Sequence, residues 1–279
     1  MVSFICRTPV RGLILTTAIA ASLMCSLEAA AQENRADPFQ DCASTSPRSI
    51  VETGLQVSFN QFGQIDQTVL GASGALGLCA TGTGVRWRLE GNYVHVDEGT
   101  NNAEAVKIGI GFTARPIRGV SGLTVTPVGR VGYENFSVGQ SNRLYGGSVT
   151  FEFVAPTGTG EDSQPGLLLE LVERPEFVSR GIVHSSVPVA SGSTNTFSNF
   201  ASAGLDGPFG TDSQWRWKAL LASTSIAEDV PTNQVFSGVV SIRPTSEEGT
   251  SYPWSVELWF SRGNGSYRGL LLSFTLRFD

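Results

Sequence analysis

A histidine and a serine separated by one residue offer the most readily named chemistry in this sequence. His184 and Ser186 lie on either side of another serine. Side chains alternate between the two faces of a β-strand, so residues two apart point the same way. An imidazole in that position could take the proton of the Ser186 hydroxyl and make it a nucleophile, with Asn195 or Asn199 orienting the ring. The alternative is that both are ordinary polar residues of a strand.

The His-x-Ser spacing is similar to the active strand of outer-membrane phospholipases and lipid A deacylases. This resemblance implies that Ser186 is the nucleophile and His184 the general base. It covers only this tripeptide. Those families follow the serine with asparagine and usually glycine, whereas Val187 and Pro188 follow here, and proline weakens a central strand. We therefore expect a protein that is not an enzyme, and keep a lipid hydrolase as an alternative.

Charged residues elsewhere alternate with apolar residues at a period of two. Between Val85 and Tyr93, apolar residues and glycine take the odd positions, while Arg86, Arg88, Glu90 and Asn92 take the even positions. The same alternation recurs in residues 106–113, 145–153, 254–261 and 270–278. Strict alternation is typical of strands with one apolar and one polar face.

Turn-forming residues separate these alternating segments, as in Gly-Asn-Gly at 263–265. No segment shows a sustained helical stripe. The strands predicted are 49–59, 64–78, 84–96, 104–114, 121–134, 143–154, 166–174, 177–187, 213–226, 233–243, 252–261 and 268–278. Residues 197–205 are either a further strand or part of a long loop.

Strand length and aromatic placement favour a membrane barrel over a soluble sandwich. Several segments allow the 9–11 residues that a tilted spanning strand needs. Tyrosine and tryptophan gather near strand ends, where interfacial rings belong; they are Tyr133, Tyr145, Trp215, Trp217, Tyr252 and Trp254. Gly109, Gly111, Gly146 and Ser148 suit a barrel interior. The predicted fold is all-β, a closed antiparallel transmembrane β-barrel of about twelve strands (ten to fourteen). We expect it to span residues 48–279.

The last strand alternates apolar residues up to the end of the chain. Phe274, Leu276 and Phe278 share one face with two leucines before them. This resembles the terminal β-signal of bacterial outer-membrane barrels, and implies the barrel-assembly machinery as a partner. Asp279 departs from the pattern, which usually ends on the aromatic residue itself.

The first 31 residues have the pattern of a secretory signal peptide. Arg7 and Arg11 come first, an uncharged apolar run occupies 13–27, and three alanines end at Ala31. We expect cleavage after Ala31; an uncleaved anchor and a lipoprotein at Cys25 are the alternatives. Residues 32–47 read as a flexible periplasmic lead-in. The predicted location is the outer membrane of a Gram-negative cell, with its lipid and lipopolysaccharide as partners.

Two cysteines remain after the signal peptide. Cys42 precedes the first predicted strand and Cys79 follows the second, so both would lie at the periplasmic rim. An even pair in an oxidising compartment predicts a disulfide, and two free thiols are the alternative. No metal site or cofactor is expected, because neither cysteine has a histidine or second cysteine at metal-ligand spacing.

Charged residues on the polar faces are the main functional clue. They are Arg86, Arg88, Glu90, Lys107, Arg130, Glu134, Glu152, Arg216, Lys218, Glu257 and Arg277. They could line a narrow aqueous pore, or pair across a small lumen and close it. We therefore expect a small porin-like channel or an envelope scaffold, with an accessory barrel of a surface-assembly or export system as an alternative. The net charge of −6 and the absence of a basic block argue against nucleic-acid binding. These patterns do not determine a solute, a protein partner or an oligomeric state.

Overall fold

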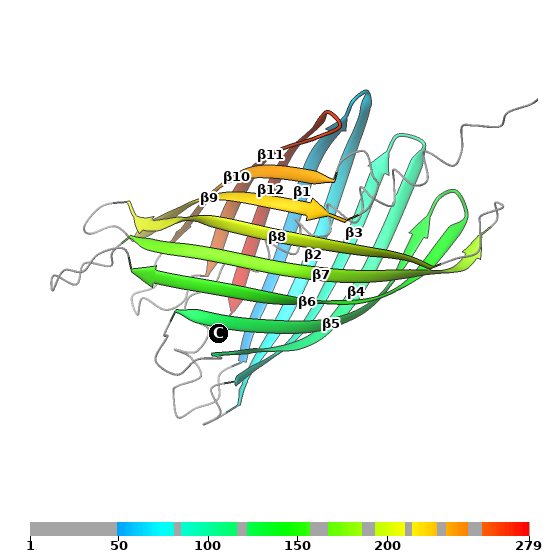
Figure 1. Cartoon of the computed structure of the whole chain (residues 1–279). Helices are drawn as coiled ribbons and strands as arrows, with labels where there is room; N and C mark the ends of the chain where they lie inside the picture. Colours follow the sequence, from blue (N-terminus) through cyan, green and yellow to red (C-terminus); the bar gives the residue numbers. More distant parts are fainter. Residues whose placement is uncertain are drawn as a thin grey trace, which may run out of the picture.

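The computed structural model describes residues 49–80, 85–115, 122–156, 167–185, 193–209, 214–227, 233–244 and 253–278 of the chain. Twelve antiparallel strands close into a barrel in sequence order, and β1 pairs with β12 (Figure 1). The strands are β1 (Ser49–Phe62), β2 (Ile65–Ala80), β3 (Val85–Glu98), β4 (Asn101–Ala114), β5 (Leu123–Phe136), β6 (Gln140–Pro156), β7 (Leu168–Ser185), β8 (Ser193–Pro208), β9 (Trp215–Ile226), β10 (Gln234–Pro244), β11 (Trp254–Gly263) and β12 (Tyr267–Phe278). The predicted barrel and its strand number are confirmed.

No helix in the described ranges combines the length and the hydrophobicity needed to cross a membrane.

The two faces of each strand have opposite chemistry. On β1, the outward Leu55 and Phe59 are 63% and 56% exposed, whereas the inward Gln56, Ser58 and Asn60 are buried. A water-soluble fold would bury the leucine and expose the amides. The barrel therefore has the arrangement of a membrane protein, with an apolar outer wall and a polar interior.

Aromatic residues mark both ends of this apolar wall. We call the end that holds Ser49 and Phe278 the terminal rim, and the opposite end the distal rim. Tryptophans lie towards the terminal rim, where Trp215 and Trp254 pack edge to face with ring centroids 5.4 Å apart. Exposed tyrosines lie towards the distal rim, at Tyr93, Tyr133 and Tyr145. Two such girdles are what a bilayer-spanning barrel requires.

Tight turns close four hairpins at the distal rim, between β1 and β2, β3 and β4, β5 and β6, and β11 and β12. Gly63, Gly99, Gly139 and Gly265 there have positive φ angles of 63°, 67°, 79° and 63°. Glycine adopts this conformation without the steric cost that a Cβ imposes. These glycines lie in gaps between predicted strands, so the sequence located these four hairpins correctly.

The predicted strands at 166–174 and 177–187 were wrong, because one continuous strand, β7, covers both. The missing strand is β8, which includes residues 197–205. Pro175 lies between these two predicted ranges. Pairing of β7 with β6 is interrupted at this residue, between Phe151↔Glu173 and Ser148↔Glu176. Pairing with β8 continues through Pro175↔Asn199. A proline is tolerated in mid-strand where the ladder that would need its missing N–H is interrupted.

Candidate functional site

The lumen of the barrel is the candidate site, and it has two parts. Towards the terminal rim the inward residues are mostly charged. Towards the distal rim they are mostly apolar. We call these parts the charged half and the apolar half. Both arise from the same alternation, because every second residue of each strand points inward.

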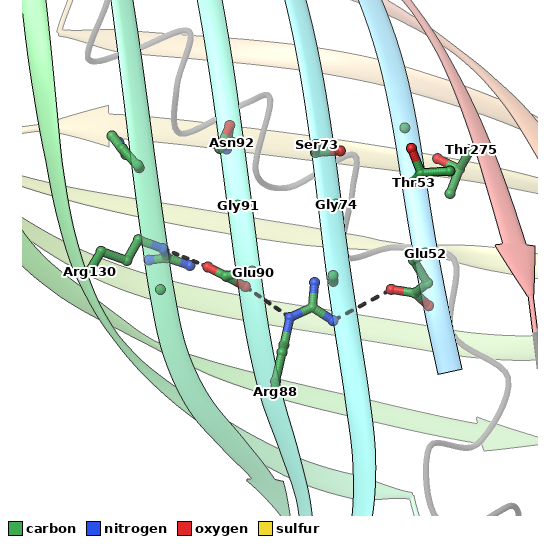
Figure 2. Close-up of a pocket in the computed structure, with 14 residues that line it drawn as sticks. Glu52, Thr53, Ser73, Gly74, Arg88, Glu90, Gly91, Asn92, Arg130 and Thr275 are labelled. Carbon is green, nitrogen blue, oxygen red and sulfur yellow. Dashed lines mark hydrogen bonds and ion pairs between the residues drawn. The ribbon is translucent and has the colours of Figure 1, made fainter. Parts of the chain in front are cut away.

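A chain of ion pairs crosses the charged half from β1 to β5. Arg88 Nη1 lies 3.5 Å from Glu52 Oε2, and Arg88 Nε donates to Glu90 Oε2 at 2.8 Å. Arg130 Nε donates to the other carboxylate oxygen of Glu90 at 2.7 Å. Figure 2 shows this row of alternating charge, with Glu90 between the two guanidinium groups. Each arginine is thus neutralised by a carboxylate on its own or a nearby strand.

The pairing continues from β5 to β8. Arg130 Nη1 donates to Ser148 Oγ at 2.7 Å and lies 4.0 Å from Glu176 Oε1. Arg180 Nε donates to Glu134 Oε1 at 3.3 Å, and its Nη1 donates to a threonine of β8. All of these charged side chains are at most 6% exposed.

The remaining arc, from β7 to β10, carries a second group of ion pairs. Lys218 Nζ lies 2.8 Å from Glu170 Oε1. Asp206 is held by two arginines at once, because Arg216 Nε donates to Oδ1 at 2.6 Å and Arg243 pairs with Oδ2. Removing one partner of a buried pair leaves an uncompensated charge, which typically costs about 3–5 kcal/mol. Because these side chains are buried, separating any pair is costly, and this cost holds the network in place.

The cavity in the arc from β1 to β5 is small. The cavity beside Glu52, Arg88 and Glu90 has about 30 Å³ available to water centres. That is room for a few water molecules and not for an organic solute. Gly109 contributes to this fit, since a Cβ at its position would lie 2.9 Å from Glu90 Cγ.

The apolar half is a cluster of buried side chains towards the distal end of the lumen. Phe62 and Tyr267 pack with ring centroids 4.7 Å apart, and Phe200 and Trp259 with centroids 6.3 Å apart. Trp259 projects from β11 into the lumen and is only 2% exposed there, because the cluster surrounds it. The guanidinium of Arg174 lies 5.4 Å from the centroid of the Phe200 ring and joins the two halves. The cluster also contains Val69, Val94, Val96, Ala103, Ala105, Phe136, Leu220, Ala222, Val239 and Leu271.

The charged residues that the sequence singled out occupy inward positions. Arg86, Lys107, Arg130, Glu134, Glu152, Lys218, Glu257 and Arg277 are buried, and Arg88, Glu90 and Arg216 are half-buried. Their role in lining a pore stays a prediction. Sequence reasoning missed six of their partners or neighbours, namely Glu52, Glu170, Glu176, Arg180, Asp206 and Arg243. The sequence could have identified them, because each of the six lies an even number of residues from the other inward polar residues of its strand.

The proposed hydrolase residues are not assembled in the described part of the chain. His184 is exposed at the end of β7, and Ser186 lies outside the described residues. Asn195 is exposed on β8. Asn199 Nδ2 donates to Glu173 Oε1 at 3.4 Å on the outer wall, so this amide is engaged by a carboxylate. The nucleophile and base therefore remain predictions from the tripeptide alone.

Two other expectations concern cysteine and metal. Cys79 ends β2 at the terminal rim, and Cys42 lies outside the described residues, so the disulfide stays a prediction. The described ranges contain no group of three or more His, Cys, Asp or Glu residues that could hold a metal ion. His95 Nδ1 lies 3.5 Å from Glu104 Oε1 on the outer wall.

Solved structures with the same fold are outer-membrane barrels. The translocator domain of the autotransporter NalP from Neisseria meningitidis superposes with a TM-score of 0.58 at 12% identity, covering 96% of this chain and 97% of that chain. The β-domain of the Bordetella autotransporter BrkA gives 0.55 at 12% identity, covering 82% and 98%. The transport unit of AIDA-I from Escherichia coli gives 0.51 at 10% identity, covering 85% and 91%.

No protein-family model and no curated protein matches the sequence. At these identities the structural similarity defines the fold. The chain thus has the fold of an outer-membrane β-barrel, with twelve strands.

Proposed function

We propose that this chain is an outer-membrane barrel whose lumen is closed to solutes at rest and which serves as an envelope scaffold. The observation that carries this proposal is the double seal of the lumen. Ion pairs fill the charged half, and the aromatic rings of Phe62, Phe200, Trp259 and Tyr267 fill the apolar half. A solute would have to displace both in series.

The energetic cost of opening supports a resting closed state. Separating Glu90 from Arg88 and Arg130 would expose three charges that are now compensated. Separating the Phe200 and Trp259 side chains would return apolar surface to water at about 25 cal/mol per Å². Thermal fluctuations do not supply both costs often, so we expect conductance to be rare or absent.

The same proposal includes the parts of the chain outside the barrel. Residues 1–31 direct secretion and are removed after Ala31, and residues 32–47 form a periplasmic lead-in. The terminal rim then faces the periplasm, and the distal rim faces the outside of the cell. A Cys42–Cys79 disulfide joins the lead-in to β2. Phe274, Leu276 and Phe278 are read by the barrel-assembly machinery.

A passive channel is the second candidate, favoured by the small charged cavity beside Glu52, Arg88 and Glu90. In that case this cavity is the narrowest part of a path that opens when the ion pairs rearrange. An accessory barrel for export is a third candidate. It is supported by the similarity in strand arrangement and length to translocator domains of autotransporters.

Planar-bilayer recording of the refolded protein tests the proposal. Its folded state is first verified by a heat-dependent mobility shift on a detergent gel. We expect no stepwise conductance from the native chain. The double variant Phe200→Ala and Trp259→Ala, which empties the apolar half, serves as a sensitised comparison and should give more frequent openings. Regular conductance steps from the native chain would refute the scaffold and favour the passive channel.

A further inference from the structure

The outer wall of β3 to β8 carries an apolar groove of about 560 Å³. Gly129, Gly147, Pro127 and Pro175 form its floor, where the wall has no large side chains. Ile110 and Phe177 stand at its two sides. Its volume lies within the range of small-molecule pockets. Because these residues are on the outward face of their strands, the groove opens towards the surrounding lipid.

The two glycines keep the groove open. Gly129 and Gly147 are direct cross-strand partners on β5 and β6. A Cβ at Gly129 would meet no atom within 4 Å, so a larger side chain there would occupy the groove without striking the wall. A Cβ at Gly147 would lie 2.8 Å from the carbonyl oxygen of Val128. Position 129 is therefore the place where the groove can be filled without disturbing the barrel.

A basic residue lies on the same strand as Gly147, farther towards the distal rim. Arg143 is on β6, four residues from Gly147 and on the same outward face, and its side chain is exposed. Its cross-strand partner is Tyr133, and Tyr145 comes next on the same face. These tyrosines are 46% and 52% exposed. No ion pair to Arg143 occurs among the residues that the structure describes.

We propose that this surface binds one lipid of the surrounding leaflet with a net negative, phosphate-bearing headgroup, with the phosphate at Arg143 and an acyl chain in the groove over Gly147 and Gly129. Charge-assisted hydrogen bonds from a guanidinium are the preferred contacts of phosphate. The hydroxyls of Tyr133 and Tyr145 add donors at the depth of the lipid headgroup. The groove alone would not select a lipid, since hydrocarbon surrounds the whole wall. The selection comes from Arg143, whose positive charge lies farther along the same strand towards the distal rim.

This binding requires only that the barrel spans a membrane. It does not depend on whether the lumen conducts. Lipid binding and conductance are therefore separate readouts, and failure of one leaves the other intact.

Native mass spectrometry of the refolded full-length barrel tests the proposal, with phosphatidylglycerol, phosphatidylcholine of the same chains and lipid A as probes. The native protein should retain one molecule of a phosphorylated anionic lipid at least tenfold more tightly than phosphatidylcholine. Arg143→Gln should abolish this preference. Gly129→Leu should weaken binding of the same lipid while Arg143 is intact. Inorganic phosphate at equal concentration should not compete, because it has no chain to fill the groove.

Matched variants from the opposite wall control for general effects. Arg262 is also an exposed outward arginine near the distal rim, and a Cβ at Gly238 also meets nothing within 4 Å. Arg262→Gln and Gly238→Leu should bind as the native chain does. Each variant must show the heat-dependent mobility shift of a folded barrel. Equal retention of phosphatidylcholine, or native binding by both Arg143→Gln and Gly129→Leu, would overturn the proposal.

Discussion

Glu90 holds two arginines of the lumen, and its replacement is the sharpest test of the closed interior. Arg88 Nε and Arg130 Nε donate to its two carboxylate oxygens at 2.8 and 2.7 Å. The three side chains are 11%, 6% and 15% exposed for Arg88, Arg130 and Glu90. In Glu90→Gln the shape is kept, but two buried guanidinium groups lose their shared negative charge.

The expected loss follows from what each arginine retains. Arg88 keeps Glu52 at 3.5 Å, and Arg130 keeps the Ser148 hydroxyl at 2.7 Å. Breaking a fully buried pair costs about 3–5 kcal/mol. The remaining partners place the loss at the lower end, at about 3 kcal/mol in the free energy of unfolding.

The assay is urea unfolding of the barrel in lipid vesicles, followed by tryptophan fluorescence and gel mobility. Glu104→Gln is the matched control, because Glu104 faces outward, is 53% exposed and lies 3.5 Å from His95. We expect at most about 1 kcal/mol from the control. A loss below about 1 kcal/mol for Glu90→Gln would show that the lumen is wet and that the ion pairs do not hold it closed.

Four further outcomes are expected. Glu173→Leu should raise the unfolding free energy by about 1–2 kcal/mol in vesicles, because its carboxylate lies on the lipid-facing wall between apolar residues of β7; a loss of stability would show that a protein partner covers this face. Trp259→Ala should lower the unfolding free energy by about 3–5 kcal/mol, since it leaves a large cavity in the apolar half; an unchanged urea midpoint would contradict the dry interior. Phe278→Ala should reduce the folded fraction found in the outer membrane on a heat-shift gel, and normal assembly would remove the terminal signal. Ser186→Ala should leave any ester hydrolysis of the purified protein unchanged, whereas its loss would revive the hydrolase alternative.

Most of the strand arrangement could be predicted from local pattern. Ten of the twelve strands lie near their predicted ranges, because each has one apolar and one polar face within about ten residues. The pattern failed around Pro175, where the single strand β7 was predicted as two. Only the pairing of β7 with both neighbours shows which ladder tolerates the missing N–H.

The candidate site was predicted in composition and not in its contacts. The misplaced strand boundary put Glu176 between two strands, and Asp206 just outside the segment 197–205. Both are inward residues that pair with or approach arginines of other strands. Trp259 and Leu271 were placed correctly on the polar faces of their strands, but nothing in a single strand indicated that they would meet Phe200 in one cluster.

The chain alone therefore specified which side chains face inward and which face outward, since that depends only on the period of two along each strand. Which inward groups touch depends on the register of twelve strands and on the closure of β1 against β12. Glu90 reaches Arg130 because Gly109 of β4 pairs with both in the register of β3, β4 and β5. Phe200 of β8 reaches Trp259 of β11 only because the sheet curves into a barrel. The packing of the lumen is for this reason a property of the assembled barrel, whose contacts join residues far apart in sequence.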